Sequence, residues 1–147
     1  MNRITQHILL GGCGDVEHLD DVQGVINCTP IRELDYEWPS HVDYARVPVF
    51  DEEEIDERYF RHAMEELAQM VTANKQILIH CMGGVSRSPS FLACYLSLSL
   101  RISPQEALDY IKTQRYGVDP HKDVWDSVIE YVREHWSDPP LPRSERV

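Results

Sequence analysis

The stretch ILIHCMGGVSRSP, residues 77–89, constrains the fold of this chain more than any other. Its three aliphatic residues predict the end of a buried strand, its glycine pair breaks that strand, and Pro89 is placed as in the first turn of a helix. Only five residues separate Cys81 from Arg87, so the loop must curl with its backbone N–H groups turned inward above the helix N-terminus. Such a nest of N–H groups binds an oxyanion.

The side chains of this loop predict a specific chemistry. Cysteine attacks as a thiolate, and the positive charge of a helix N-terminus and of a neighbouring guanidinium favours that form of Cys81. The planar guanidinium of Arg87 matches two phosphate oxygens in a way that no lysine can. Ser88 can donate a hydrogen bond to the thiolate. The loop therefore predicts a phosphate cradle with a sulfur nucleophile and phosphoryl transfer through a cysteinyl-phosphate.

The pattern His80-Cys81, five residues, Arg87-Ser88 resembles the signature of cysteine-dependent protein tyrosine phosphatases, and most of all the small (atypical) dual-specificity phosphatases. The resemblance implies that Cys81, Arg87 and Ser88 carry the reaction. It implies that His80 hydrogen-bonds the loop and tunes the thiolate, whereas a histidine without this context would be a buried core residue. It also implies that the loop amides bind the substrate phosphate; these belong to Met82, Gly83, Gly84, Val85 and Ser86.

A general acid is needed because the alkoxide or phenolate of the substrate leaves poorly without a proton. In the family that this chain resembles, the acid is an aspartate about thirty residues before the cysteine, and Asp51 occupies that place. Glu52 is the alternative. Its neighbours Glu53, Glu54 and Asp56 are typical of a solvated acidic surface.

Strand and helix patterns alternate along the chain, which predicts an α/β phosphatase fold with a central, mostly parallel sheet of about four to five strands and helices on both faces. Strands are expected at residues 8–10, 25–29, 44–49 and 77–79, and helices at 58–73, after Pro89, after the capping box of Ser103 and Glu106, and around 125–136. The family resemblance implies a further short helix at residues 15–19. Ligands of such sheets bind at the carboxyl ends of the strands, where Cys81 and Asp51 both fall.

The 147 residues predict one catalytic domain over residues 1–137. Residues 138–147 contain Pro139, Pro140 and Pro142 without periodicity, so a disordered tail is expected. The sequence has neither an apolar run of about 18 residues nor a signal-peptide pattern, and we expect a soluble, cytoplasmic protein.

The cysteines are scattered, without a Cys-x-x-Cys pair, so neither a metal site nor a disulfide scaffold nor a cofactor is predicted; they are Cys13, Cys28, Cys81 and Cys94. A reducing compartment fits this pattern. Cys28 lies at the carboxyl end of the second predicted strand, and some phosphatases that this chain resembles place a resolving cysteine there. Cys28 is thus a redox candidate for Cys81, the alternative being a small buried core residue.

The net charge of −11 disfavours nucleic acid and anionic membranes as partners and favours a phosphoprotein substrate with basic flanks. In the family that this chain resembles, members that act on phosphoinositides or RNA 5′ ends commonly carry a basic residue inside the loop, and residues 82–86 have none. Two other functions stay open: hydrolysis of a non-protein phosphate ester, and binding of phospho-residues without turnover.

Tyr36 and Trp38 lie in a stretch without periodicity. The family resemblance implies that this segment lines the active-site cleft, where Tyr36 or Trp38 contacts substrate; the alternative is that they cover the edge of the core. Pro120 is followed by His121, where many dual-specificity phosphatases have asparagine, so the contacts of that asparagine are in question here.

Overall fold

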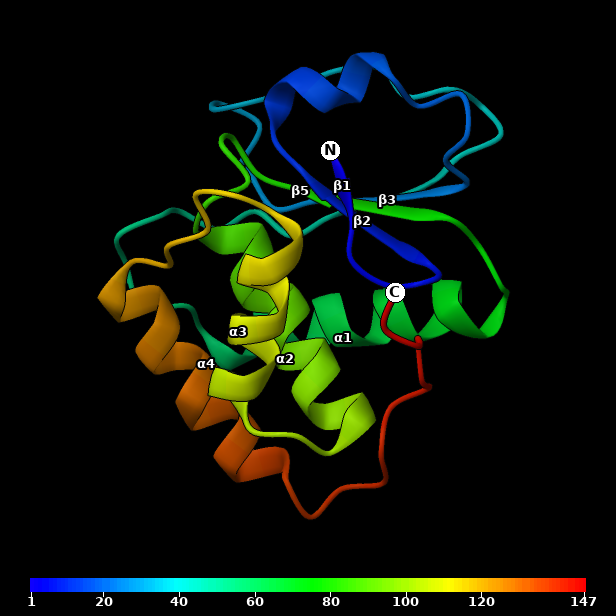
Figure 1. The fold of residues 1–147 in the computed structure, drawn as a ribbon. Helices are drawn as coiled ribbons and strands as arrows, with labels where there is room; N and C mark the ends of the chain where they lie inside the picture. Colours follow the sequence, from blue (N-terminus) through cyan, green and yellow to red (C-terminus); the bar gives the residue numbers. More distant parts are fainter.

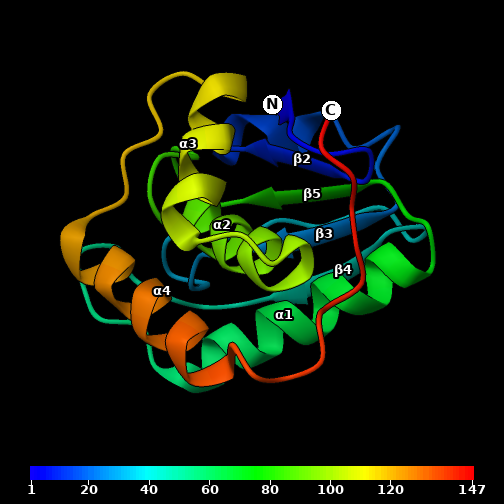
Figure 2. The ribbon, with the colours of Figure 1, turned by 60° about the horizontal axis from the view of Figure 1, so that its bottom comes forward.

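The computed structural model describes all 147 residues and contains one five-stranded sheet with the order β1-β2-β5-β3-β4 (Figures 1 and 2). Only β1 runs antiparallel to its neighbour, so the expected mostly parallel sheet is confirmed. The central strand, β5, is the one that leads into the cysteine loop. The strands are β1 (Asn2–Arg3), β2 (Ile8–Gly11), β3 (Gly24–Asn27), β4 (Asp43–Arg46) and β5 (Ile77–His80).

The helices cover the two faces of the sheet unequally. All four α-helices lie on one face, while a 3-10 helix, η1, and long loops lie on the other (Figure 1). Helices thus lie on both faces of the sheet, as expected, but the second face carries only the short helix η1. The bounds are η1 (Cys13–Glu17), α1 (Glu57–Thr72), α2 (Arg87–Leu100), α3 (Pro104–Gln114) and α4 (Lys122–His135). No helix combines the length and the apolar character needed to cross a membrane.

Alternation along β5 divides the apolar core in two. Ile77 and Ile79 belong to a cluster of 33 buried residues between the sheet and the α-helices. Leu78 points to the opposite face, where it joins a cluster of only five buried residues. Successive residues of a strand face opposite sides of the sheet. His80 therefore points, like Leu78, toward the face that carries η1, and Cys81 points, like Ile79, toward the α-helices.

The helices form where their sequences predict them. On α1, the side chains of Phe60, Met64, Leu67 and Val71 are all buried, as their helical spacing indicates. Helix α2 is buried along almost its whole length and occupies the centre of the helical layer. Ser103 is the N-cap of helix α3, and its hydroxyl accepts a hydrogen bond from the N–H of Glu106 at 3.1 Å.

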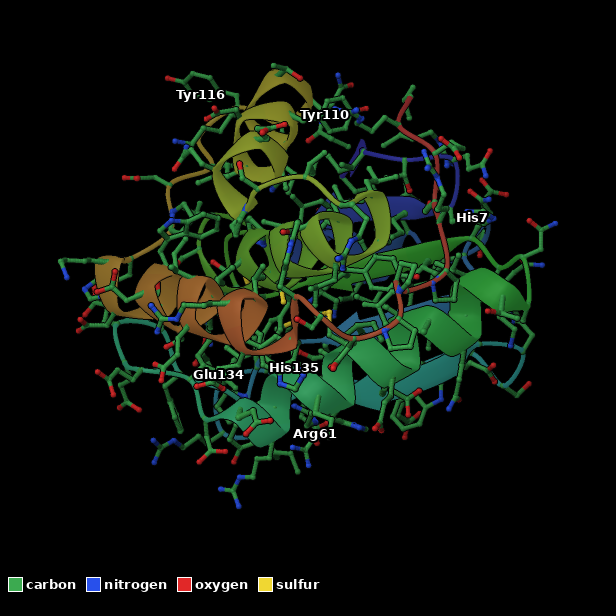
Figure 3. The ribbon with its side chains drawn as sticks, turned by 90° about the horizontal axis from the view of Figure 1, so that it is seen from below. His7, Arg61, Tyr110, Tyr116, Glu134 and His135 are labelled. Carbon is green, nitrogen blue, oxygen red and sulfur yellow. The ribbon has the colours of Figure 1, made fainter.

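Helix α4 packs against α1 and α2. Figure 3 shows His135 of α4 where α4 lies beside α1, and its Nε2 lies 3.1 Å from Oε1 of Glu57 of α1. The stripe of residues 125, 129, 132 and 136 correctly predicts a helix but only part of its buried face, since Val132 is buried and Trp125 packs against the core. Ile129 and Trp136 are exposed, whereas the residues that face the core include Val124, Val128 and Tyr131.

Residues 138–147, for which the sequence predicts a disordered tail, lie against the rest of the domain in this structure. Residues 138–147 run as a strap from α4 back to the start of the chain (Figure 2), where Arg146 forms a β-bridge with Thr5. The hydroxyl of Tyr95 donates to the carbonyl of Pro142 at 2.5 Å. Ser144 is fully buried, and its Oγ lies 3.0 Å from Nδ1 of His7, which Figure 3 shows beside the strap. Prolines do not prevent this packing because an extended strap needs no helical or strand ladder.

Candidate active site

In the loop between β5 and α2, every backbone carbonyl accepts a hydrogen bond from another group of the protein. The carbonyls of Met82, Val85 and Ser86 accept hydrogen bonds from backbone N–H groups of Cys13, Asp119 and Ser90, at 2.7, 2.9 and 3.1 Å. Those of Gly83 and Gly84 accept from the guanidinium of Arg115, at 3.2 and 3.1 Å. In contrast, no backbone N–H of residues 82–88 donates to another group of the protein. The carbonyls of residues 82–86 are thus satisfied, while the seven N–H donors of residues 82–88 are free. Such a row of free N–H groups forms a cradle for an anion.

Glycine is required inside this cradle. Gly84 has φ +67°, a left-handed conformation that side chains disfavour, and a Cβ there would lie 2.6 Å from the carbonyl oxygen of Gly11. Gly12 faces the same restriction from the other side, since its Cβ would lie 2.8 Å from the carbonyl oxygen of Met82. The turn that follows β2 and the cysteine loop therefore pack backbone against backbone.

Cys81 lies at the floor of the loop and is only 2% exposed. Its Sγ is 3.2 Å from Oγ of Ser88, the second residue of α2. A hydroxyl at this distance can donate to a thiolate or accept from a thiol. The structure thus brings the predicted nucleophile and Ser88 into contact.

Arg87 is nearly buried and connects three segments. Its Nη1 donates to the carbonyl of Val49 at 2.9 Å, and its Nη2 pairs with the carboxylate of Glu33. Burial acts to lower the pKa of this guanidinium, but the hydrogen bond to Glu33 and the negative charges of Cys81, Glu33 and Asp51 outweigh it and raise the pKa. Arg87 therefore remains a cation beside the thiol.

Asp51 reaches the loop through Ser86. The hydroxyl of Ser86 donates to Oδ1 of Asp51 at 2.7 Å and accepts from the backbone N–H of His121 at 2.9 Å. Asp51 is half-buried, while Glu52, Glu53 and Glu54 are exposed. The geometry thus singles out Asp51 from its acidic neighbours. At position 121 the backbone, not the side chain, contacts the loop; the imidazole instead caps α4 by accepting from the N–H of Asp123.

His80 is fully buried on the face of the sheet that carries η1. Its Nδ1 lies 3.3 Å from the carbonyl of Cys81 and its Nε2 lies 2.8 Å from the hydroxyl of Tyr36. Desolvation lowers the pKa of His80 from 6.5 to about 4, against the opposing hydrogen bond to Cys81. The neutral ring must therefore donate from Nδ1 to the carbonyl and accept at Nε2 from Tyr36.

The aromatic loop residues pack on the sheet. Tyr36 contacts His80 and Tyr44, and Trp38 stacks on Tyr44 with ring centroids 3.9 Å apart. These contacts favour the interpretation that Tyr36 and Trp38 cover the edge of the core. Tyr36 nonetheless reaches the site indirectly, through His80.

Cys28 is the first residue after β3. Asn27 pairs with His80 in the parallel ladder, and the N–H of Cys28 donates to the carbonyl of His80 at 2.8 Å, which makes Cys28 and Cys81 neighbours in register. Burial, together with the charge of Cys81, raises the pKa of the Cys28 thiol. All four cysteines are unpaired in this structure.

Two functional candidates escaped sequence analysis. Glu33 is one of several carboxylates in a loop, and Arg115 is a cation at the end of a helix, where cations are common. Neither has a local pattern that points to the cysteine loop. A hint exists only for Glu33, which lies shortly after the strand that neighbours β5.

The fold and this loop, with a cysteine at its floor and an arginine at the first turn of the next helix, define the class of cysteine-dependent phosphatases. A family model described as "Dual specificity phosphatase, catalytic domain" matches residues 15–134, which is most of the chain. The chain therefore belongs to the dual-specificity phosphatase catalytic-domain family, as the resemblance indicated.

Named relatives share this region. The human "Dual specificity protein phosphatase 2" is 26% identical over 135 residues, which cover 87% of this chain and 42% of that protein. The "Tyrosine-protein phosphatase vhp-1" of Caenorhabditis elegans is 29% identical over 136 residues, which cover 87% of this chain and 20% of that protein. The chain thus spans less than half the length of these curated relatives.

Solved structures share the fold. The crystal structure of human DUSP28 has a TM-score of 0.80 at 22% identity and covers 93% of this chain and 99% of that one. The human tyrosine phosphatase-like serine/threonine/tyrosine-interacting protein has a TM-score of 0.86 at 18% identity, with coverages of 93% and 98%. A structure of PTPMT1 in complex with PI(5)P has a TM-score of 0.77 at 20% identity, with coverages of 88% and 92%.

Proposed function

We propose that this chain is a phosphoprotein phosphatase that hydrolyses phosphotyrosine and phosphoserine or phosphothreonine through a cysteinyl-phosphate. The observation that carries the proposal is the row of free N–H groups from Met82 to Ser88 around the thiol of Cys81. A tetrahedral oxyanion needs such a cradle, and the family match supplies independent support.

The proposed reaction begins with Cys81. Its thiolate attacks the phosphorus of the substrate while the loop N–H groups and Arg87 neutralise the phosphoryl oxygens. Asp51 gives its proton to the departing oxygen of the side chain, and the phosphoryl group is then bonded to sulfur. In the second half of the reaction Asp51 takes a proton from water, the hydroxide oxygen bonds to phosphorus, and the S–P bond breaks to release phosphate and the thiolate.

Other residues support these steps. Ser88, next to the sulfur, stabilises the thiolate when it leaves, and His80 fixes the carbonyl of Cys81. The exposed carboxylates of Glu52, Glu53 and Glu54 beside Asp51 favour substrates with basic flanks. We also propose a reducing, cytoplasmic location, because all four thiols are unpaired and the reaction needs one of them reduced.

The test compares the wild type with Cys81→Ser and Arg87→Lys on p-nitrophenyl phosphate. We expect no turnover above the rate without enzyme for Cys81→Ser, with phosphate binding retained because the cradle is intact. Arg87→Lys should lose both binding and turnover, because lysine cannot form the bidentate pair. Acid quench of the wild type should trap phosphate on Cys81. A Cys81→Ser variant that keeps substantial turnover contradicts the mechanism.

The second candidate is hydrolysis of a non-protein phosphate ester, because the fold is shared with the PTPMT1 structure that contains PI(5)P. The absence of a basic side chain among residues 82–86 favours phosphoproteins instead. A panel of phosphopeptides and soluble phosphatidylinositol phosphates separates the two. A lipid that exceeds every phosphopeptide tenfold in kcat/KM supports the second candidate, and a wild type that binds phosphopeptides without turnover supports a binding protein.

A further inference from the structure

Two hydrogen-bond partners fix the guanidinium of Arg87 beside the cysteine loop. The side chain is 6% exposed, and two of its five N–H donors are in use, one from each Nη. The Nη1 donor is taken by the carbonyl of Val49 and the Nη2 donor by the carboxylate of Glu33. Three N–H donors remain, including that of Nε, which is enough for a bidentate pair with a phosphate.

The segment that carries Glu33 is itself fixed. The N–H of Glu33 donates to the carbonyl of Pro30 at 3.0 Å, which closes a turn after β3. Arg46 of β4 donates to the carbonyls of Thr29 and Leu34, both at 2.9 Å, on either side of that turn. Arg32, which precedes Glu33 in the turn, lies over the ring of Phe50, 4.2 Å from the centroid. The turn therefore also contacts the segment that carries Asp51.

We propose that Glu33 is a positioning residue that holds Arg87 in the orientation that binds the substrate phosphate. The proposal rests on the proposed function, since it concerns the same site. A free arginine side chain loses considerable rotamer freedom when it binds a ligand, and a carboxylate partner removes that freedom beforehand. Glu33 thus raises phosphate affinity although its own charge repels the ligand.

The opposite role is the main competitor. A carboxylate on the phosphate-binding arginine could act as a substitute for the substrate and reduce its affinity. The number of free donors on Arg87 argues against this, because phosphate can bind without displacing Glu33. The two roles predict opposite changes in affinity when the carboxylate is removed.

The experiment measures the Kd of inorganic phosphate by calorimetry, together with kcat and KM for p-nitrophenyl phosphate. We expect Glu33→Ala to raise Kd and KM about tenfold, with a smaller effect on kcat, because orientation is lost mainly in the step that binds the phosphate. Glu33→Gln should return both constants to within about threefold of the wild type, since its Oε1 still accepts from Nη2. Glu33→Asp keeps the charge but is one methylene shorter, and should resemble Glu33→Ala.

Glu37→Ala is the matched control, because Glu37 is an exposed carboxylate in the same loop. It should not change Kd or KM. A Kd for Glu33→Ala equal to that of the control, or lower than that of the wild type, overturns the proposal. If Glu33→Ala fails to fold, the order of Glu33→Gln and Glu33→Asp decides, and equal affinities for these two also overturn it. Phosphate binding that requires Arg87 without any turnover would reject the proposed function while leaving this test intact.

Discussion

The hydroxyl of Ser86 lies between the backbone of His121 and the carboxylate of Asp51, accepting from the first at 2.9 Å and donating to the second at 2.7 Å. A residue of the phosphate loop thereby holds the proposed general acid to the loop. Helix α4 begins one residue after His121, so the position of the acid depends on an element that is distant in sequence.

Replacing Ser86 with alanine should release Asp51. We expect kcat to fall about tenfold for a phosphoserine peptide, because a well-placed general acid contributes roughly 10²- to 10⁴-fold and only its placement is lost. The fall should be smaller for p-nitrophenyl phosphate, whose leaving group departs with little help from an acid. Ser86→Thr should restore activity, and Ser40→Ala, at an exposed serine, is the control. Equal losses on the two substrates would show that Ser86 does not act through Asp51.

Arg115 should be needed for the shape of the cradle. Its guanidinium donates to the carbonyls of Gly83, Gly84 and Leu10 and to the side chain of Asn2, at 2.9 to 3.3 Å. Arg115→Met should lower the free energy of unfolding by about 2 kcal/mol, since each hydrogen bond contributes roughly 0.5 to 1.5 kcal/mol net.

The same variant should weaken phosphate binding more than Arg115→Lys, because methionine leaves the loop carbonyls without any cation. Lys112→Met, at an exposed position of α3, is the control for removal of a charge. Urea unfolding and calorimetry with phosphate measure the two effects. Unchanged phosphate affinity in Arg115→Met would limit Arg115 to a role in stability.

His80 should make the fold sensitive to acid. Its pKa is about 4 in the folded protein and near 6.5 when unfolded, so between these values the unfolded chain binds a proton that the folded chain refuses. The free energy of unfolding should therefore decrease as the pH falls from 6.5 to 4, by an amount on the order of 3 kcal/mol.

Urea titrations at several pH values test this, and His80→Gln should remove this part of the slope. His62→Gln, at an exposed histidine, should leave it unchanged. The same slope in His80→Gln and the wild type would contradict the assignment to His80.

Cys28 remains a candidate partner of Cys81 under oxidation. The two residues are adjacent in register, and neighbouring parallel strands lie roughly 4.8 Å apart, within the roughly 7 Å that a disulfide spans. Peroxide would convert Cys81 to a sulfenic acid, and attack by Cys28 would form the disulfide and release water.

The raised pKa of Cys28 makes its thiol a slow nucleophile at neutral pH, so the yield of cross-linked peptide should increase with pH. Peptide mapping after mild peroxide measures this yield. After peroxide treatment, dithiothreitol should restore activity to the wild type but not to Cys28→Ser. It should also restore activity to Cys94→Ser, the control at a buried cysteine of α2. Direct formation of sulfinic acid at Cys81 without the cross-link would leave Cys28 as a core residue.

Sequence analysis succeeded where a local pattern determines the structure. The loop after Ile79 is predicted because its glycines, proline and spacing act within a dozen residues, and α1 because its apolar residues repeat at helical spacing. The contacts of Glu33 and Arg115 could not be predicted in this way, since each joins segments that only the tertiary structure brings together. The strap was missed for the same reason, because its order comes from the surface that it covers.

That strap has a consequence for the order in which the protein opens. Thr5 and Ser144 are 139 residues apart in sequence, so their contact forms only when the tertiary structure brings the two ends of the chain together. Contacts of such long range form late in folding and add little to the core, so they can break without global unfolding. Amide hydrogen exchange should therefore be faster for Leu141, whose N–H donates to Leu98, than for the strands of the sheet. The end of the chain would be the first part of this phosphatase domain to become accessible to a protease.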